Sequence, residues 1–319
     1  MGNPKKKKRK KQITKAQLFR RVFFTSVLIF SFIAYGVFYG ISLLDKMNQV
    51  EIPKTNEDLG IKEDIREEKN IINIALLGID RRNPNERGRS DSIMIATLDK
   101  THKKIKLTSL MRDTYVDIPG RGKDKLNHAY SYGGPELIIK TINQNFDMNI
   151  REFAAVDFQG FIEIIDILDG VEINIKPNEV SHVPGSKSGT QILNGEQALA
   201  YSRIRKTGNG DYERTERQRR ILEKVINKGL SAGIGQYPKL LNSILPFVDT
   251  SLSNAEALAL GTSTITNGIK DIDQFRVPVD KHLKHQTINK VFYIIPQTME
   301  DNVDILHKFI YDNEKYNED

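Results

Sequence analysis

Two aspartates lie where one apolar segment ends and the next begins. Asp80 ends the run IINIALLGID, and Asp91 lies in GRSDS, at the start of the run SIMIATLD. A hairpin-like return would set the two carboxylates side by side, and Gly78 would permit a close backbone approach there. A carboxylate pair without His or Cys nearby suits a hard cation such as Mg²⁺. The alternative is a pair of turn residues whose charge is offset by adjacent arginines.

Basic residues follow in the next two segments. Arg112 emerges from SLMRDTYVDIPG and would lie near the aspartates if the strands are neighbours. The alternative for Arg112 is an ordinary salt bridge with Asp113 or Asp117. Downstream, KDKLNHAYSYGG is a candidate anion-facing loop with three polar residues before a helix: Lys125, Asn127 and His128.

The strongest candidate site is in residues 200–220, where six arginines surround a glycine-bearing loop: Arg203, Arg205, Arg214, Arg217, Arg219 and Arg220. Helical spacing puts Arg214, Arg217 and Gln218 on one face, continuous with an apolar stripe that must pack inside. These side chains are expected at the edge of the core near a helix N-terminus, and forked guanidinium groups suit phosphate oxygens. Arg219 and Arg220 point elsewhere and are expected to be solvated. Asp211 has the alternative role of a helix N-cap.

The composition excludes several other kinds of site. The chain has no cysteine, so disulfides, thiolate metal sites and a cysteine nucleophile are excluded. It contains neither a Walker loop nor the nucleophile elbow of a serine hydrolase. His282 and His285 have no third ligand nearby, so we expect surface histidines rather than a zinc site.

The net charge of +7 belongs to the N-terminal tail. Residues 1–21 hold ten of the 48 Lys and Arg residues and no acid, which leaves 38 basic against 41 acidic residues, a net charge of −3, in the rest of the chain. An acidic body without an evident helix-turn-helix does not favour a nucleic-acid partner.

The tail precedes an apolar segment that is long enough to cross a membrane. Residues 22–44 are 23 residues without a charge. As a helix they would be roughly 34 Å long, which exceeds the thickness of about 30 Å of a hydrocarbon core. Lysines before the segment and acids after it predict a cytoplasmic N-terminus and an extracellular body, as in a single-pass type II signal anchor. The alternatives fit less well, because a cleaved signal peptide has a shorter apolar region and a buried helix usually has a polar face.

The body alternates strands and helices. Residues 45–70 are rich in charge and lack apolar periodicity, so we expect an extracellular linker there. The expected strands are 71–80, 92–99, 104–113, 153–158, 171–175 and 274–280, and the expected helices are 135–146, 158–168, 194–201, 213–229, 236–246, 254–266 and 301–312. This alternation predicts an α/β sandwich over residues 71–315, with helices on both faces of a central mixed β-sheet.

The segments, taken in order, resemble the LytR-CpsA-Psr family of cell-wall enzymes. Between about residues 71 and 228 the chain contains LLGIDRR, RSDS, SLMRDTYVDIPG, KLNHAYSYGG, AAVDFQGFIEIIDILDGVEI, LNGEQALAYSRIR and GDYERTERQRR. The resemblance implies an α/β/α sandwich that holds a lipid chain in an apolar tunnel. It also implies a phosphotransferase on the outer face of the cell membrane of a Gram-positive-type envelope. Such an enzyme moves an anionic glycopolymer, such as wall teichoic acid or capsule, from undecaprenyl pyrophosphate to peptidoglycan through a phosphodiester bond.

The resemblance also implies roles for individual residues. Asp80 and Asp91 match magnesium-binding carboxylates, with Mg²⁺, or Mn²⁺ in its place, as the cofactor. The residues expected to be catalytic are Asp91, Arg112, Arg203 and Arg205, and Asp91 is our hypothesis for the base. The residues expected to bind the pyrophosphate are Arg89, Arg112, Lys125, Arg203, Arg205, Asp211, Arg214, Arg217 and Gln218. The region after about residue 230 is expected to contribute packing and acceptor contacts.

Two other functions are consistent with these sequence features. A non-catalytic polyprenyl-phosphate-binding protein of the envelope would have the same basic pocket and tunnel, and a pyrophosphatase would release the same lipid product to water. The arginines recognise phosphate rather than sugar, so the pattern does not distinguish teichoic acid from capsule.

Overall fold

The computed structural model describes residues 46–81, 87–208, 210–231, 240 and 243–316. These residues belong to one compact unit, Leu43–Asp319. The expected basic tail and membrane anchor, and most of the helix expected at 236–246, lie outside the described residues. Within the described part of the chain, no helix is long and apolar enough to span a bilayer.

The centre of this unit is a seven-stranded mixed sheet in the order β1 (Asn48–Gln49), β10 (Asp249–Thr250), β7 (Glu152–Asp157), β2 (Ile71–Asp80), β3 (Arg89–Asp99), β4 (Lys104–Leu110) and β11 (Asp271–Val277). Strand β3 is antiparallel to both of its neighbours, β2 and β4, whereas β7 is parallel to β2 and β11 is parallel to β4. The apolar, β-branched runs form strands because such side chains pack well on a pleated surface. Five of the expected strands are therefore confirmed: 71–80, 92–99, 104–113, 153–158 and 274–280, with small differences at their ends.

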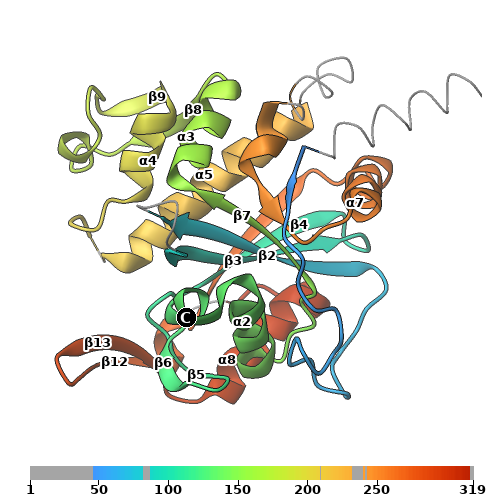
Figure 1. Ribbon diagram of the computed structural model, residues 1–319. Coiled ribbons are helices and arrows are strands. Elements are labelled where there is room, and N and C mark those ends of the chain that lie inside the picture. Colours follow the sequence, from blue (N-terminus) through green and yellow to red (C-terminus); the bar gives the residue numbers. More distant parts are fainter. Residues whose placement is uncertain (1–45, 82–86, 209, 232–239, 241–242, 317–319) are drawn as a thin grey trace, which may run out of the picture. The chain divides into compact units, whose positions relative to one another are not determined.

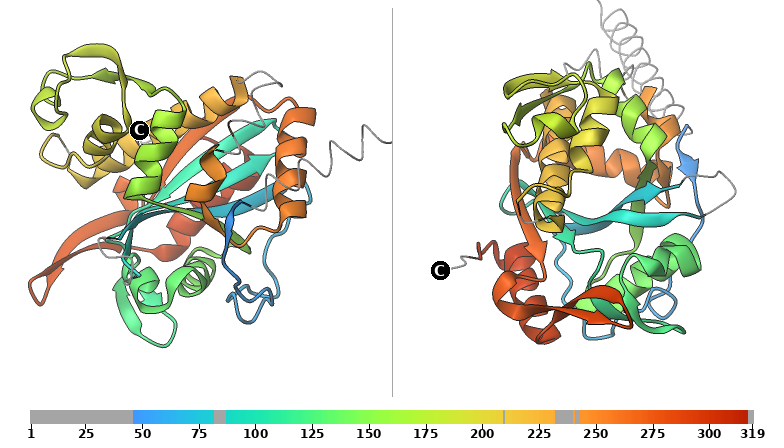
Figure 2. Two further views of the ribbon diagram at one scale, coloured as in Figure 1. Left: turned by 45° about the horizontal axis from the view of Figure 1, so that its top comes forward. Right: turned by 90° about the vertical axis from the view of Figure 1, so that its left-hand side faces the viewer.

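Helices cover both faces of the sheet (Figures 1 and 2). On one face lie α3 (Phe158–Ile167), α4 (Gly195–Ser202) and α5 (Asp211–Ser231), and on the other lie α2 (His128–Phe146) and α8 (Met299–His307), which continues as a π-helical turn (Lys308–Asp312). The remaining helices of the described residues are α7 (Asn254–Thr266) and short 3₁₀ turns at Val180–His182, Leu245–Phe247 and Asp280–His282. The expected α/β architecture with a central mixed sheet is confirmed.

Three two-stranded sheets lie outside the central sheet in the described part of the chain: β5 (Tyr115–Ile118) with β6 (Gly122–Lys125), β8 (Val171–Ile175) with β9 (Gly189–Leu193), and β12 (Leu283–Ile288) with β13 (Val291–Pro296). The segment 171–175 is a strand as expected, but its partner is β9 rather than a strand of the central sheet.

Local sequence explains where the helices begin. The carboxylate of Asp157 accepts a hydrogen bond from the Gly160 amide at 2.9 Å and caps α3, and α4 begins with an Asn194–Gln197 capping box. In α2 the backbone of Gly134 has φ of +68° and interrupts the helix just before Pro135. The helix expected at 135–146 is confirmed, but it is preceded by a further helical segment that begins at His128.

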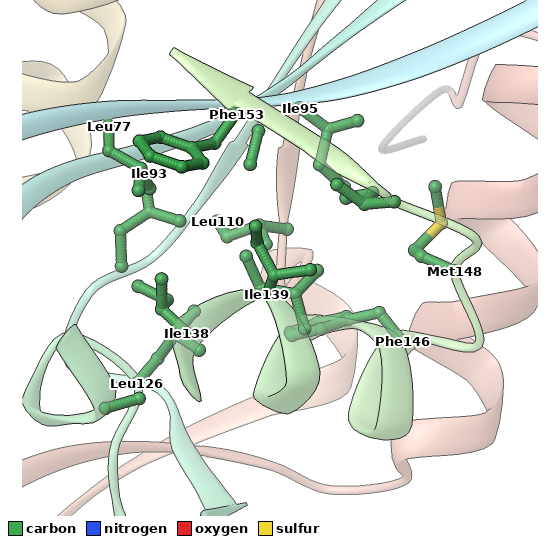
Figure 3. Packing of buried hydrophobic residues seen from close by; sticks show 14 of the residues in the cluster. Leu77, Ile93, Ile95, Leu110, Leu126, Ile138, Ile139, Phe146, Met148 and Phe153 are labelled. Carbon is green, nitrogen blue, oxygen red and sulfur yellow. The ribbon is translucent and has the colours of Figure 1, made fainter. Parts of the chain in front are cut away.

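The main core lies between the sheet and α2. Buried side chains from β2, β3, β4 and β7 meet those of α2 there, as Figure 3 shows for Leu77, Ile93, Leu110, Ile139 and Phe153. This packing fixes the ends of β2, β3 and β4 relative to one another, and the candidate site lies at those ends.

Residues 46–69 pack on the domain, in contrast to the linker that we expected. β1 pairs with β10, Leu59 and Ile61 are buried in the main core, and the Asn143 amide donates a hydrogen bond to the Leu59 carbonyl at 2.9 Å. The apolar residues of this segment follow turns rather than a regular element, so they show no periodicity that would reveal their burial.

Replacement of Leu59 by alanine is expected to lower the free energy of unfolding by about 2–5 kcal/mol, because the side chain is fully buried and its loss leaves a cavity. Urea unfolding of the purified protein, followed by circular dichroism, measures this change. Glu57→Ala is the control, because Glu57 is exposed in the same segment. Equal unfolding midpoints for Leu59→Ala and the parent protein would show that the segment is not part of the folded domain.

Candidate functional site

The β2–β3 hairpin positions the two aspartates. Ile79 pairs with Ser90 and Gly78 pairs with Ser92, so Asp91 is the extra residue of a β-bulge. A bulge redirects a side chain at the end of a strand pair. A side chain at Gly78 would not fit, because its Cβ would lie 2.9 Å from the Ser92 Cβ. The expected hairpin is confirmed, and Asp80 and Asp91 line the same two polar pockets.

Arg112 follows β4, and its side chain contacts Asp91 on the neighbouring strand β3. Its Nη1 donates a hydrogen bond to Asp91 Oδ1 at 2.7 Å, its Nε lies 3.5 Å from Asp113 Oδ2, and its Nη2 lies 3.7 Å from Asp211 Oδ1. Burial alone would lower the pKa of Arg112, but the three carboxylates outweigh burial and raise the pKa. The expected approach of Arg112 to the aspartates is confirmed, and the alternative salt bridge with Asp113 is present at the same time.

Helix α5 contributes Asp211, Arg214 and Gln218. The Arg214 side chain is 2% exposed, and its Nη2 lies 2.9 Å from Asp211 Oδ2 and 3.4 Å from the Asp91 carbonyl oxygen. Burial lowers the pKa of Arg214 to about 10, so the side chain stays cationic at neutral pH. Arg214 Nε and Gln218 Oε1 are buried without a hydrogen-bond partner among the described residues. Such atoms at a cavity wall indicate a place for a ligand.

The segment that follows α4 adds Arg203 and Arg205. The Arg203 guanidinium lies 4.7 Å from the centre of the Phe158 ring, in a cation–π contact. Arg205 Nη2 lies 3.7 Å from Asp91 Oδ2, and half of the Arg205 side chain is exposed. Both guanidinium groups therefore stand at the edge of the site, where a phosphate could reach them.

Arg89 and Lys125 come from β3 and β6. Arg89 is exposed, and it shares a polar pocket with Lys125, Asp91 and Arg112. The Lys125 ammonium donates a hydrogen bond to Asp113 at 2.6 Å. Asp113 thus contacts both Lys125 and Arg112. From the sequence alone, Asp113 is considered only as a salt-bridge partner of Arg112.

Arg217 is not part of this group, in contrast to our expectation. Its Nε donates to Glu179 at 2.8 Å, its Nη1 donates to the Ile204 carbonyl at 3.1 Å, and its Nη2 donates to both Thr207 and Glu213 at 2.6 Å. The side chain is 2% exposed. A guanidinium with these bonds braces the loop around Ile204–Thr207 and has no position from which to bind a pyrophosphate.

The expectation that Arg219 and Arg220 are solvated is wrong for Arg219. Arg219 is buried, and its Nη1 donates to the Ser109 hydroxyl on β4 at 2.8 Å. Burial lowers the pKa of Arg219 to about 10. Arg220 is partly exposed and donates to the Tyr201 hydroxyl and Glu216. The spacing in α5 separates the faces of the helix correctly, but it does not show that a strand covers the second face.

Three hollows meet at Asp91 and Arg205, which line all of them. The first, here called the apolar cavity, has a volume of about 270 Å³ and lies between the sheet and helices α3, α4 and α5. Its apolar walls include Leu76, Met94, Val156, Phe161, Leu222 and Val225, and its polar mouth includes Arg203, Arg205, Arg214 and Gln218.

The other two hollows are polar. The Lys206 pocket has a volume of about 410 Å³ and is lined by Asp80, Asp91, His182, Ala200, Arg203, Ile204, Arg205 and Lys206. The His128 pocket has a volume of about 260 Å³ and is lined by Asp80, Arg89, Asp91, Arg112, Asp113, Lys125, Asn127, His128 and Arg205. The site can therefore receive three different groups around Asp91 and Arg205.

Asp80 and Asp91 offer a site to a divalent cation that also has other ligands. Among the described residues, no group of three or more His, Asp or Glu residues could hold a metal ion. Two carboxylates at open pockets fit Mg²⁺, which keeps several waters and takes further oxygens from substrate phosphates. His282 and His285 have separate partners: His282 lies 3.2 Å from Asp301, and His285 lies 2.7 Å from the Tyr212 hydroxyl.

Comparison with known proteins gives consistent matches. The LytR_cpsA_psr family model matches residues 35–307. The regulatory protein MsrR of Staphylococcus aureus (strain COL) is 36% identical over 212 residues, which cover 65% of this chain and 64% of MsrR. The chain thus spans somewhat less than two thirds of the length of that relative.

Two further matches cover more of the chain. The polyisoprenyl-teichoic acid–peptidoglycan teichoic acid transferase TagU of Bacillus mycoides (strain KBAB4) is 30% identical over 274 residues, 85% of this chain and 88% of TagU. The solved structure of TagT bound to LI-WTA superposes with a TM-score of 0.67 at 25% identity, over 82% of this chain and 99% of that structure.

Proposed function

Because the chain belongs to the LytR-CpsA-Psr family, we propose that it is a phosphotransferase of cell-wall assembly. Its donor would be an anionic glycopolymer of the wall teichoic acid kind on a polyprenyl pyrophosphate carrier, and its acceptor would be peptidoglycan. The reaction would join them through a phosphodiester bond. The names of TagU, a teichoic acid transferase, and of the TagT complex with LI-WTA support this assignment.

The observation that carries the proposal is the junction between the apolar cavity and the charged group. The cavity opens between Arg203, Arg205 and Arg214, directly beside Asp91. A polyprenyl pyrophosphate has the same division, since a long apolar chain ends in two phosphates. The chain would lie between the sheet and α3–α5, and its phosphates would meet the arginines, whose forked donors suit phosphate oxygens.

We propose separate tasks for the residues around the phosphates. Arg112, held by three carboxylates, would present a fixed positive charge to the transferred phosphate. Arg203, Arg205, Arg214 and Gln218 would bind the leaving lipid phosphate at the mouth of the cavity. Asp80 and Asp91 would hold Mg²⁺, which supplies charge neutralisation to phosphate oxygens when bound.

The proposed location places the enzyme next to its lipid donor. Residues 22–44 would anchor the chain as a single-pass type II membrane protein, with residues 1–21 in the cytoplasm and the catalytic domain outside. A polyprenyl carrier lies in the same membrane. The anchor would therefore hold the enzyme at the membrane of a Gram-positive-type envelope.

The test uses the purified protein with a radiolabelled polyprenyl-pyrophosphate disaccharide, peptidoglycan oligomers, and Mg²⁺ either present or chelated. Label is expected on peptidoglycan only when Mg²⁺ is present. Tight lipid binding without transfer would instead indicate a carrier-binding protein. Release of labelled sugar phosphate to water, without labelled peptidoglycan, would indicate a pyrophosphatase.

Asp80→Asn is expected to slow transfer by on the order of 10²-fold and to raise the Mg²⁺ concentration that gives half of the maximal rate, because one of two carboxylate ligands is lost. Binding of the lipid donor should persist, since the apolar cavity is unchanged. Asp304→Asn, at an exposed residue that pairs with Lys308, is the matched control. An unchanged Mg²⁺ requirement in Asp80→Asn would remove Asp80 from the metal site.

A further inference from the structure

On the basis of the proposed function, we propose that the His128 pocket receives the acceptor sugar, with Asn127 and His128 binding its attacking hydroxyl. The pocket shares Asp91 and Arg205 with the apolar cavity. The two hollows belong to opposite faces of the sheet. In Figure 1, the cavity-forming helices α3, α4 and α5 lie above the sheet, whereas β6 and the start of α2, which carry Lys125 and His128, lie below it.

The in-line geometry of phosphoryl transfer places the acceptor on this side of the sheet. In phosphoryl transfer the entering and leaving oxygens lie roughly in line, on opposite sides of the phosphorus. The leaving group is the lipid phosphate, whose chain occupies the apolar cavity. An acceptor hydroxyl must therefore approach the phosphorus beside Asp91 from the far side, where the His128 pocket opens.

Both polar pockets contain basic side chains beside the aspartates, so the groups that can bind a hydroxyl, rather than charge, distinguish the acceptor side. The Lys206 pocket contains Arg203, Arg205 and Lys206 beside the two aspartates, so it suits the anionic polymer of the donor. The His128 pocket contains groups that can bind a hydroxyl. Asn127 is 4% exposed, and its Oδ1 has no hydrogen-bond partner among the described residues. A buried carbonyl oxygen in that state indicates a missing donor, and a sugar hydroxyl can supply one.

His128 is oriented to accept the proton of that hydroxyl. Its Nδ1 lies 2.8 Å from Asp124 Oδ2, so Nδ1 carries the hydrogen and Nε2 remains as the acceptor nitrogen. Asp124 is held in turn by the Tyr132 hydroxyl at 2.7 Å and by the Lys125 amide at 2.8 Å. Burial raises the pKa of Asp124, but these hydrogen bonds and the one from His128 outweigh burial and lower the pKa.

The aspartate that we first considered as the base is less suited to that task. Asp91 Oδ1 accepts a hydrogen bond from Arg112 at 2.7 Å, and Asp91 Oδ2 lies 3.7 Å from Arg205. Both oxygens thus lie near guanidinium groups, and the proposed metal would share them. His128 has one carboxylate partner on its far nitrogen, as in other oriented bases.

The proposed step balances without a further reactant. The acceptor oxygen forms a bond to the phosphorus that carries the polymer, and the bond from that phosphorus to the lipid phosphate oxygen breaks. The lipid phosphate leaves with the electron pair. The hydroxyl proton moves to His128 Nε2 and then to water.

The test measures steady-state transfer with the radiolabelled lipid-linked disaccharide and peptidoglycan oligomers, varying each substrate separately. His128→Gln is expected to lower kcat by about 10²-fold or more. Asn127→Ala is expected to raise KM for the oligomers by about 10-fold, the usual loss for one hydrogen bond to a buried group. Lipid affinity should stay unchanged in both variants, which also shows that they are folded.

His102→Gln is the matched control, because His102 forms the same kind of pair with Asp99 at 2.8 Å, at the other end of β3. Unchanged kcat in His128→Gln and unchanged oligomer KM in Asn127→Ala, with the parent protein active, would overturn the acceptor site while leaving the proposed function intact. Weaker lipid binding in these variants, with oligomer KM unchanged, would also overturn it. Absence of transfer by the parent protein would overturn the proposed function and the acceptor site together.

Discussion

Arg112→Ala is expected to lower the rate of transfer by about 10³-fold while the protein remains folded. Arg112 is the cation shared by Asp91, Asp113 and Asp211, which lie 2.7, 3.5 and 3.7 Å from its nitrogens. Without it, these carboxylates face one another across the position proposed for the transferred phosphate. The loss therefore combines a missing positive charge with repulsion of the substrate.

The lysine variant separates charge from geometry. Arg112→Lys keeps one positive charge but not the fork that reaches several oxygens, so we expect transfer about 10²-fold below the parent rate. Arg66→Ala is the control, because Arg66 is an exposed arginine with two acidic partners, Glu68 and Asp312. Rates measured with saturating lipid donor and Mg²⁺ give the comparison. Transfer at the parent rate in Arg112→Ala would exclude Arg112 from the reaction.

Arg217→Met is expected to lower the free energy of unfolding by about 3–5 kcal/mol, because it leaves Glu179 as a buried and unpaired charge. The two side chains are 2% and 1% exposed and 2.8 Å apart. The same change frees the Ile204 carbonyl and the Thr207 hydroxyl, so the loop that carries Arg205 should also lose its position. Urea unfolding measures the first effect, and the KM for the lipid donor measures the second.

A double variant tests whether the unpaired charge of Glu179 causes the loss of stability. Glu179→Gln keeps a polar side chain that can still accept the hydrogen bond from the Lys176 amide. The double variant Arg217→Met/Glu179→Gln is therefore expected to recover a substantial part of the lost stability, since the buried charge is gone. If the double variant is as unstable as the sum of the single variants, the ion pair is not the source of the loss.

The local sequence pattern was sufficient to predict most of the strands and helices and the end of the sheet at which the site lies. The β-branched apolar runs of β2, β3, β4 and β7 are visible in the sequence because a strand exposes its pattern within a few residues. Asp80 and Asp91 were placed at one end of the sheet for the same reason, since each lies at the end of such a run. The face shared by Arg214 and Gln218 follows from helical spacing alone.

The sheet partner of a strand was less predictable. The segment 171–175 has the composition of a strand, yet it pairs with β9 outside the central sheet. Residues 46–69 have no regular spacing, yet Leu59 and Ile61 enter the core. In both cases the deciding contacts come from residues far away in the sequence, and local periodicity carries no information on them.

The sequence by itself determined the α/β class, the strand ends that carry the carboxylates and the helix that carries the arginines. Only the tertiary structure decided which of those arginines faces a ligand. Arg214 and Arg217 are three residues apart on α5, but Arg214 lies at the mouth of the apolar cavity, whereas Arg217 is enclosed by Glu179 and the Ile204–Thr207 segment. Spacing along a helix sets which side chains share a face, and long-range packing sets what covers that face.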